Sequence, residues 1–277
     1  MSSERLEARR PPRNSLAMPD GPRTRLIQAL QLFADLQVYT VRRDVKSWLT
    51  RRRGLLLEVG CGDQPYRSLV PVECRYSGID QVEATGNFDM NSTQGITLYS
   101  GESFPCSDET FDALFHTEVL EHVFKYRIFL SECRRVLKPG GEMMFTVPFQ
   151  ARFHFAPHDY FRYTPSALTA LLDEAGFVDV EIEPRGTDVT VAAYKAVAVF
   201  FRWAYGGLFA KILFVLASPV AVLLLLLAHV SLLWPFGSSD DCLGYSVKAR
   251  AAPPVSRPEQ PWPGSQEAVP ASDVLPY

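Results

Sequence analysis

The chain has 277 residues, 47% of them hydrophobic, and a formal net charge of -3 at pH 7. This length and composition allow a sizeable buried core, so we expect one main domain with additions. The five cysteines are odd in number and include no C-x-x-C pair, which argues against a disulfide framework and a zinc site. No secretory signal peptide is expected, because the first residues are rich in arginine and lack an apolar segment.

Residues 1–53 are expected to form a basic arm followed by a helix. They contain twelve Arg or Lys and five acidic residues, a local balance of +7. Such an arm suits an anionic membrane surface or a nucleic acid, and a solvated flexible arm is the alternative. Apolar residues at helical spacing between Arg23 and Arg53 predict a helix that packs on the main domain or lies against lipid.

Residues 54–188 alternate short apolar runs with amphipathic ones, which predicts strand, helix, strand units. The expected fold class is α/β, a doubly wound and mostly parallel sheet with ligands at the carboxyl ends of its strands. The expected strands are Leu55–Val59, Arg75–Ile79, Asp112–His116, Glu142–Val147 and Val178–Glu183. The expected helices are Phe129–Leu137, ended by "KPGG", and Ser166–Ala175.

The first expected strand runs directly into two close glycines in "LLLEVGCGDQPYR". Gly60 and Gly62 allow a tight turn and a close approach of the backbone to a ligand. Pro65 stands where a dinucleotide-binding turn would place a third glycine, which weakens a pyrophosphate interpretation. Glu58 suits a cationic ligand, and Asp80, at the end of "GID", can accept hydrogen bonds from both ribose hydroxyls. This set favours a nucleoside that carries positive charge and no phosphate.

Five motifs, "LLLEVGCGDQPY", "GID", "FDALFHTEVLEHV", "RRVLKPGG" and "FTVPF", follow in order over roughly residues 54–187. In these motifs the sequence resembles the class I S-adenosylmethionine-dependent methyltransferases, particularly the type 11 group. The resemblance implies a seven-stranded sheet whose last, antiparallel strand lies between the fifth and the sixth. It also implies S-adenosyl-L-methionine as cofactor. The residues expected around this cofactor are Glu58, Gly60, Cys61, Gly62, Gln64, Asp80, Glu102, Thr117 and Glu118.

The sequence departs from the family pattern at two places. Gln64 stands where many members have a third glycine, and it could add a polar contact to the cofactor. Ser100 aligns with the acid that meets the adenine amine in many relatives, and Glu102 follows two places on. A solvated loop acid is the alternative for Glu102. For Glu121 and His122 in "LEHV", a helix-start acid and a packed histidine are favoured over substrate contact.

The candidate chemistry lies in "FHFAPHDYFRYTP", after the expected strand that ends in "FTVPF". Methyl transfer to a hydroxyl is an in-line displacement that requires a base for the acceptor proton. We expect His158 as this base, Asp159 as its orienting partner and His154 as the second choice. The alternative is a loop whose Thr164 only caps the following helix. No metal site is predicted.

Residues 189–239 form a predicted membrane-associated insertion. Ile212–Trp234 has 23 residues without Asp, Glu, Lys or Arg, long enough to cross a bilayer, and a buried core helix is the alternative. Residues 240–250 suit the final strand of the sheet, so a single complete crossing is excluded. We favour a monotopic or re-entrant arrangement that returns at Pro219 over a hairpin, because Lys195 and Arg202 are costly in a full span. The proline-rich residues 251–277 are expected to be disordered.

These parts predict a methyltransferase at the cytoplasmic face of a membrane, contacting it through Val189–Trp234. The expected reaction is O-methylation of a membrane-associated acceptor, a lipid-linked saccharide or a glycolipid. The alternatives are isoprenoid quinone methylation, a non-catalytic scaffold with this fold, aminopropyl transfer, or a small soluble acceptor. Nucleic acid is not expected as a partner, because no N/D-P-P-Y motif occurs. The sequence does not specify the oligomeric state.

Overall fold

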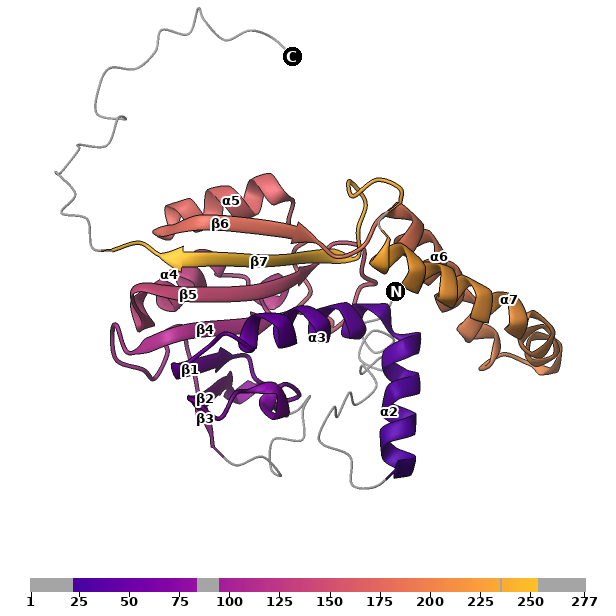
Figure 1. Ribbon diagram of the computed structural model, residues 1–277, viewed down its shortest axis with the longest axis horizontal. Coiled ribbons are helices and arrows are strands. Elements are labelled where there is room, and N and C mark those ends of the chain that lie inside the picture. The colour runs from indigo at the N-terminus through magenta and orange to yellow at the C-terminus, as the bar shows by residue number, and fades with distance from the viewer. Residues whose placement is uncertain (1–21, 84–94, 235, 254–277) are drawn as a thin grey trace, which may run out of the picture.

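The computed structural model describes residues 22–83, 95–234 and 236–253. Figure 1 shows a central sheet with helices on both faces and a pair of helices that extends beyond one end of the sheet. The predicted basic arm up to residue 21 and nearly all of the predicted disordered tail lie outside the described residues.

The sheet has seven strands in the order β3-β2-β1-β4-β5-β7-β6. All neighbours pair in parallel except β7, which lies antiparallel between β5 and β6. The fold class and the place of the last strand are therefore confirmed, and one short strand, β3, was missed. The strands are β1 (Gly54–Val59), β2 (Cys74–Gln81), β3 (Ile96–Tyr99), β4 (Phe111–Thr117), β5 (Leu137–Pro148), β6 (Phe177–Pro184) and β7 (Gly244–Ala251).

Alternating side chains of the inner strands fill two apolar cores. Leu56 packs with Trp48 of α3 (Leu36–Leu49) on one face. Leu57 packs on the other face with Phe129 of α4 (Tyr126–Val136) and Leu168 of α5 (Pro165–Glu174). Because successive strand residues point to opposite faces, both faces of β1 are covered, as its unbroken apolar run indicates.

The N-terminal helix is two helices, α2 (Pro22–Ala34) and α3, where the sequence suggested one. Asp35 lies between them in an extended conformation, and its Oδ1 accepts hydrogen bonds from the Gln37 and Val38 amides at 3.1 and 3.2 Å. An aspartate in this position caps a new helix, which explains the break. At the other predicted cap, Thr164 accepts from the Ala167 amide and α5 begins at Pro165, as expected.

The segment "KPGG" ends α4 but does not separate it from the next strand. β5 begins at Leu137, directly after the helix, and runs to Pro148. Leu137 pairs with Phe111 and Glu142 with Ala113, so the residues between them form an irregularity in the β4–β5 ladder. The predicted strand Glu142–Val147 is thus the regular part of the longer strand β5. The proline and glycines of "KPGG" are accommodated in β5 because the ladder is interrupted there.

The apolar insertion is a helical hairpin of α6 (Asp188–Trp203) and α7 (Leu208–Leu233). The favoured return at Pro219 was wrong, since α7 continues through it. The Ser218 hydroxyl donates to the Val215 carbonyl at 2.8 Å, the carbonyl that proline leaves without its usual amide. By length and composition alone, α7 is the one helix among the described residues that could cross a bilayer, with a mean hydropathy of 2.6 over its most apolar window.

Candidate functional site

A cleft of about 1320 Å³ lies at the carboxyl ends of the parallel strands. Its walls come from the turn after β1, the end of β2, the segment after β4, the loop after β5, and helices α3 and α6. Twelve residues were expected in the site, and ten of them line this cleft: Glu58, Gly60, Cys61, Gly62, Asp80, Glu102, Thr117, Glu118, His154 and His158. Gln64 and Asp159 do not.

The turn after β1 is held closed by the end of β2. Gly60 and Gly62 have φ of 67° and 51°, which favours glycine, and a Cβ on Gly60 would stand 2.6 Å from Val119 Cγ2. Asp80 Oδ2 accepts from the Gly62 amide at 2.7 Å, and its Oδ1 accepts from the Gln81 amide at 2.7 Å. Each oxygen keeps a further lone pair that can face the cleft.

Gln64 was expected to contact the cofactor, but the structure turns it away from the cleft. Its φ of 56° puts it in the left-handed region, at the position where relatives have glycine. Its side chain is buried behind the turn, where a Cβ on Gly78 would stand 3.1 Å from Gln64 Nε2. The missing side chain at Gly78 therefore makes room for Gln64, a pairing that the linear motif does not reveal.

Glu58 lies buried at the base of the turn and accepts a hydrogen bond from the Tyr76 hydroxyl. Burial raises the pKa of Glu58 to about 8, against the lowering effect of that hydrogen bond. Near neutral pH the carboxyl group is therefore mostly protonated until a positive charge approaches it.

The two candidates for the adenine side differ in position. Glu102 lines the cleft but is exposed and pairs with Lys125, while Ser100 is exposed outside the cleft lining. Aromatic side chains that sequence reasoning missed, Tyr99 and Phe104, line the same side of the cleft. Neither residue was marked by the sequence, because Tyr99 is the last residue of the short, unpredicted strand β3 and Phe104 follows that strand.

Glu118 is fixed by an arginine that sequence reasoning also missed. Its φ is 51°, and its Oε1 accepts from Arg185 Nη2 at 2.8 Å. Arg185 is fully buried, and Nη2 also donates to the Val147 carbonyl at 3.2 Å. Its only signal in the sequence was a lone arginine shortly after the predicted strand Val178–Glu183.

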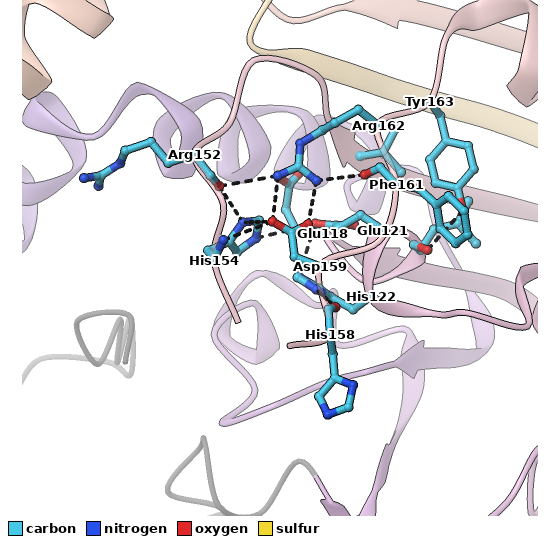
Figure 2. Close-up of polar contacts among 12 residues, drawn as sticks. Glu118, Glu121, His122, Arg152, His154, His158, Asp159, Phe161, Arg162 and Tyr163 are labelled. Carbon is cyan, nitrogen blue, oxygen red and sulfur yellow. Dashed lines mark hydrogen bonds and ion pairs between the residues drawn. The ribbon is translucent and has the colours of Figure 1, made fainter. Parts of the chain in front are cut away.

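The loop after β5 does not join the two residues that were expected to act together. Figure 2 shows the His158 ring pointing away from the Asp159 carboxylate, which faces His154 and Arg162. His158 Nδ1 is 2.8 Å from the Tyr160 hydroxyl, whereas Asp159 Oδ2 is 3.2 Å from His154 Nδ1. Asp159 as the partner of His158 was therefore wrong, because neighbouring residues of this extended loop point to opposite sides.

Glu121 and His122 form the floor beneath this loop, on the short helix η4 (Leu120–His122). Burial raises the pKa of Glu121 well above its usual value, with a further contribution from Glu118. Burial also lowers the pKa of His122 to about 4, although its hydrogen bond with the His158 carbonyl works in the opposite direction. Both groups are thus favoured in their uncharged forms, and His122 lines the cleft.

Comparison with known proteins agrees with this architecture. Residues 57–145 match the family model described as a methyltransferase domain. The chain carries a class I methyltransferase domain of the type 11 group. This methyltransferase domain includes the turn after β1, Asp80 and the η4 floor, whereas the loop bearing His154 and His158 follows the matched residues.

Two curated relatives match the methyltransferase over part of their length. A probable S-adenosylmethionine-dependent methyltransferase of Mycolicibacterium smegmatis is 32% identical over 136 residues, 44% of this chain and 51% of the relative. A ubiquinone biosynthesis O-methyltransferase of Dinoroseobacter shibae is 30% identical over 165 residues, 50% of this chain and 66% of the relative. The chain thus spans about half to two thirds of the length of these relatives.

A solved structure has the same fold. The crystal structure of a SAM dependent methyltransferase from Archaeoglobus fulgidus superposes with a TM-score of 0.50 and 16% identity, covering 78% of this chain and 94% of the other. At this identity the match supports the methyltransferase fold and says nothing of the acceptor.

Replacing Gly60 by Ala should weaken binding of the S-adenosylmethionine that the motifs imply by roughly 10- to 100-fold, because strain and the contact with Val119 displace the turn. Titration calorimetry measures this. Gly140→Ala is the matched control: its φ is also positive, at 75°, but nothing lies within 4 Å of the added Cβ. Equal affinities of the Gly60→Ala and wild-type chains would remove the turn from the donor site.

Proposed function

We propose that this methyltransferase transfers the methyl group of S-adenosyl-L-methionine to a hydroxyl of an apolar, membrane-associated acceptor. One observation carries the proposal: a single cleft connects the turn after β1 with His158 and with α6, the first helix of the apolar hairpin. A donor and an acceptor drawn from a membrane could therefore meet in one cavity.

The donor end of the cleft suits a cationic nucleoside. Asp80 keeps a lone pair on each oxygen for the ribose hydroxyls, after accepting from two backbone amides. Glu58 supplies a buried carboxyl group that a sulfonium ion would favour in its charged form. The bare backbone at Gly60 and Gly62 allows the donor to approach β1 closely.

At the acceptor end, His158 is proposed to receive the hydroxyl proton as the new bond to carbon forms. It lines the cleft, and the Tyr160 hydroxyl holds its Nδ1 at 2.8 Å. Tyr160 thus replaces Asp159 as the group that orients the ring. With Nδ1 bonded to Tyr160, Nε2 is the atom left to act on the acceptor.

For the acceptor class, a relative changes the preference that the residues alone suggested. The Dinoroseobacter shibae protein is named for ubiquinone biosynthesis, whereas no such support exists for a lipid-linked saccharide or a glycolipid. We therefore favour a hydroxylated isoprenoid quinone intermediate as the acceptor. An acceptor of this kind is itself membrane-soluble, which agrees with a cleft beside an apolar hairpin.

The hairpin is proposed to hold the chain at the cytoplasmic face of a membrane. Figure 1 shows α6 and α7 extending from the end of the sheet where α2 also projects. Since β6 and β7 flank the hairpin and belong to one sheet, both of its ends stay on one side of the membrane. Apolar side chains exposed on α7 and directly after it include Leu208, Phe209, Ile212, Val215, Leu216, Val220, Leu223, Leu226, Leu233 and Trp234.

Donor affinity should rise with pH. The free chain holds a proton on Glu58 up to a pKa of about 8, and the sulfonium favours the carboxylate, so the pKa in the complex is lower and binding releases a proton. Calorimetry should show affinity rising by up to about tenfold per pH unit below pH 8 and levelling above it. Glu58→Gln should abolish this slope. A flat or falling wild-type profile would contradict the role of Glu58.

The reaction itself is tested by incubating the purified chain in detergent with radiolabelled S-adenosylmethionine and a total membrane lipid extract. Label should enter a prenyl lipid, and label confined to a soluble metabolite would disprove a membrane acceptor. His158→Ala should bind the donor normally and lose about 10²- to 10⁴-fold in turnover. Unchanged turnover would leave His158 without a role in proton transfer.

Membrane attachment is tested by flotation with vesicles that contain anionic lipid. Leu216→Glu combined with Leu223→Glu should release the chain, because each charge costs about 3 kcal/mol in the apolar region. Val72→Glu, at an exposed position before β2, is the matched control and should float like the wild type. Equal flotation of all three chains would show that the hairpin is not the attachment surface.

A further inference from the structure

Glu121 is a buried acid whose carboxylate is left without partners of the usual kind. Its side chain has no exposed surface, and among the described residues neither carboxylate oxygen accepts a hydrogen bond from another residue. Buried carboxylates are normally paired with a cation or with several donors. The methyl transfer proposed above does not use Glu121, so the burial of this carboxyl group without partners requires another explanation.

Two histidines direct the same kind of atom at this carboxylate. His122 Nε2 lies 3.5 Å and His154 Nε2 lies 3.9 Å from Glu121 Oε1. His122 Nδ1 is 2.7 Å from the His158 carbonyl, and His154 Nδ1 is 2.9 Å from the Arg152 carbonyl. A carbonyl only accepts hydrogen bonds, so both Nδ1 atoms carry the proton. A ring whose single proton is on Nδ1 presents the lone pair of Nε2 toward the carboxylate.

The geometry points to a site for one divalent transition-metal cation, of zinc type, held by Glu121 Oε1, His122 Nε2 and His154 Nε2. One ligand atom from each of these three residues lies within 4.8 Å of the other two. Bonds of about 2.0 to 2.2 Å in a tetrahedral site place ligand atoms roughly 3.3 Å apart, so a small contraction brings all three into range. Two imidazoles and one carboxylate favour such an ion over Mg²⁺, which prefers oxygen ligands.

The surroundings hold the three ligands as metal sites require. Histidine ligands usually donate the other ring N–H to a carbonyl or carboxylate, and both histidines do so here. Asp159 Oδ2 also lies 3.2 Å from His154 Nδ1, and Arg162 holds that carboxylate with two bonds of 2.6 and 2.8 Å. Figure 2 shows His154 and Arg162 facing the Asp159 carboxylate, with Glu121 and His122 in the same cluster of side chains.

The loop is also fastened to the helix that bears the other two ligands. The amides of Tyr160 and Phe161 both donate to the Glu121 carbonyl, at 3.0 and 3.3 Å. This contact fixes the distance between η4 and the loop, although the two are far apart in the sequence. The side chain of Asp159, which was expected to orient His158, instead orients His154.

The site lies on the wall of the cleft, because His122 and His154 both line it. A three-ligand cation keeps a position for a further ligand, and here that position can face the acceptor. If the proposed function holds, the cation would bind the acceptor hydroxyl oxygen and lower its pKa before His158 takes the proton. The acceptor would then have to be a molecule whose hydroxyl oxygen can bind the metal and face the donor methyl group at the same time.

The test uses the full chain, freed of metal with a chelator and without donor or acceptor. Titration with Zn²⁺ in calorimetry and with Co²⁺ in visible absorption should show one equivalent bound per chain, with Co²⁺ bands of nitrogen and oxygen ligation. Glu121→Gln and His154→Ala should each lower the affinity by about 100-fold or more. The matched controls, His158→Ala and His229→Ala, should bind the metal as the wild type does.

Absence of binding to the wild type, or unchanged binding in both ligand variants, would overturn the site. In that case we expect Glu121 to be protonated and to donate a hydrogen bond to Nε2 of one of the two histidines. His154→Ala removes a half-exposed loop side chain, so it remains informative even if Glu121→Gln does not fold, and circular dichroism checks both. Binding of S-adenosylmethionine, measured separately, distinguishes failure of this site from failure of the proposed function.

Discussion

A buried arginine is the constraint on which the cleft depends. Arg185 follows β6, has no exposed surface and must satisfy its charge inside the protein. Its guanidinium reaches the Thr40 hydroxyl of α3, the Val147 carbonyl of β5 and the Glu118 carboxylate after β4. Its own amide donates to the Gly244 carbonyl of β7. The side chain of Arg185 thus joins α3, β5 and the segment after β4, and its backbone amide adds β7, so the cleft wall at Glu118 is fixed with them.

The position of Gly60, Gly62 and Asp80 at one edge of the sheet could be predicted because its determinants are local. Gly60 and Gly62 directly follow the apolar strand β1, Asp80 lies near the end of β2, and parallel pairing of these two strands brings the three residues together. What failed there depended on packing between distant residues. Gln64 turns inward beside Gly78, where a Cβ would stand 3.1 Å from Gln64 Nε2. β3 is short and half-exposed, so neither periodicity nor burial marked it in the sequence.

For the loop after β5, the sequence indicated which side chains lie near one another but not which of them form hydrogen bonds or ion pairs. The sequence placed His154, His158 and Asp159 in one loop, yet adjacency along an extended chain separates side chains instead of joining them. Arg162 and the His154 amide hold the Asp159 carboxylate on the side opposite to His158. Glu121 and His122 come from η4, and the loop meets η4 through backbone hydrogen bonds and through side chains such as His154. These contacts join distant residues and leave no pattern in the sequence.

The position of the hairpin between β6 and β7 also dictates an order of assembly. β6 has β7 as its one neighbour in the sheet, and β7 is synthesised only after both hairpin helices. Until then the apolar edge of β5 is open, and strand pairing over so long a separation is slow. Early contact of the hairpin with lipid would cover its apolar surface while β7 pairs with β5 and β6. The apolar insertion would then assist folding before it holds the folded chain at a membrane.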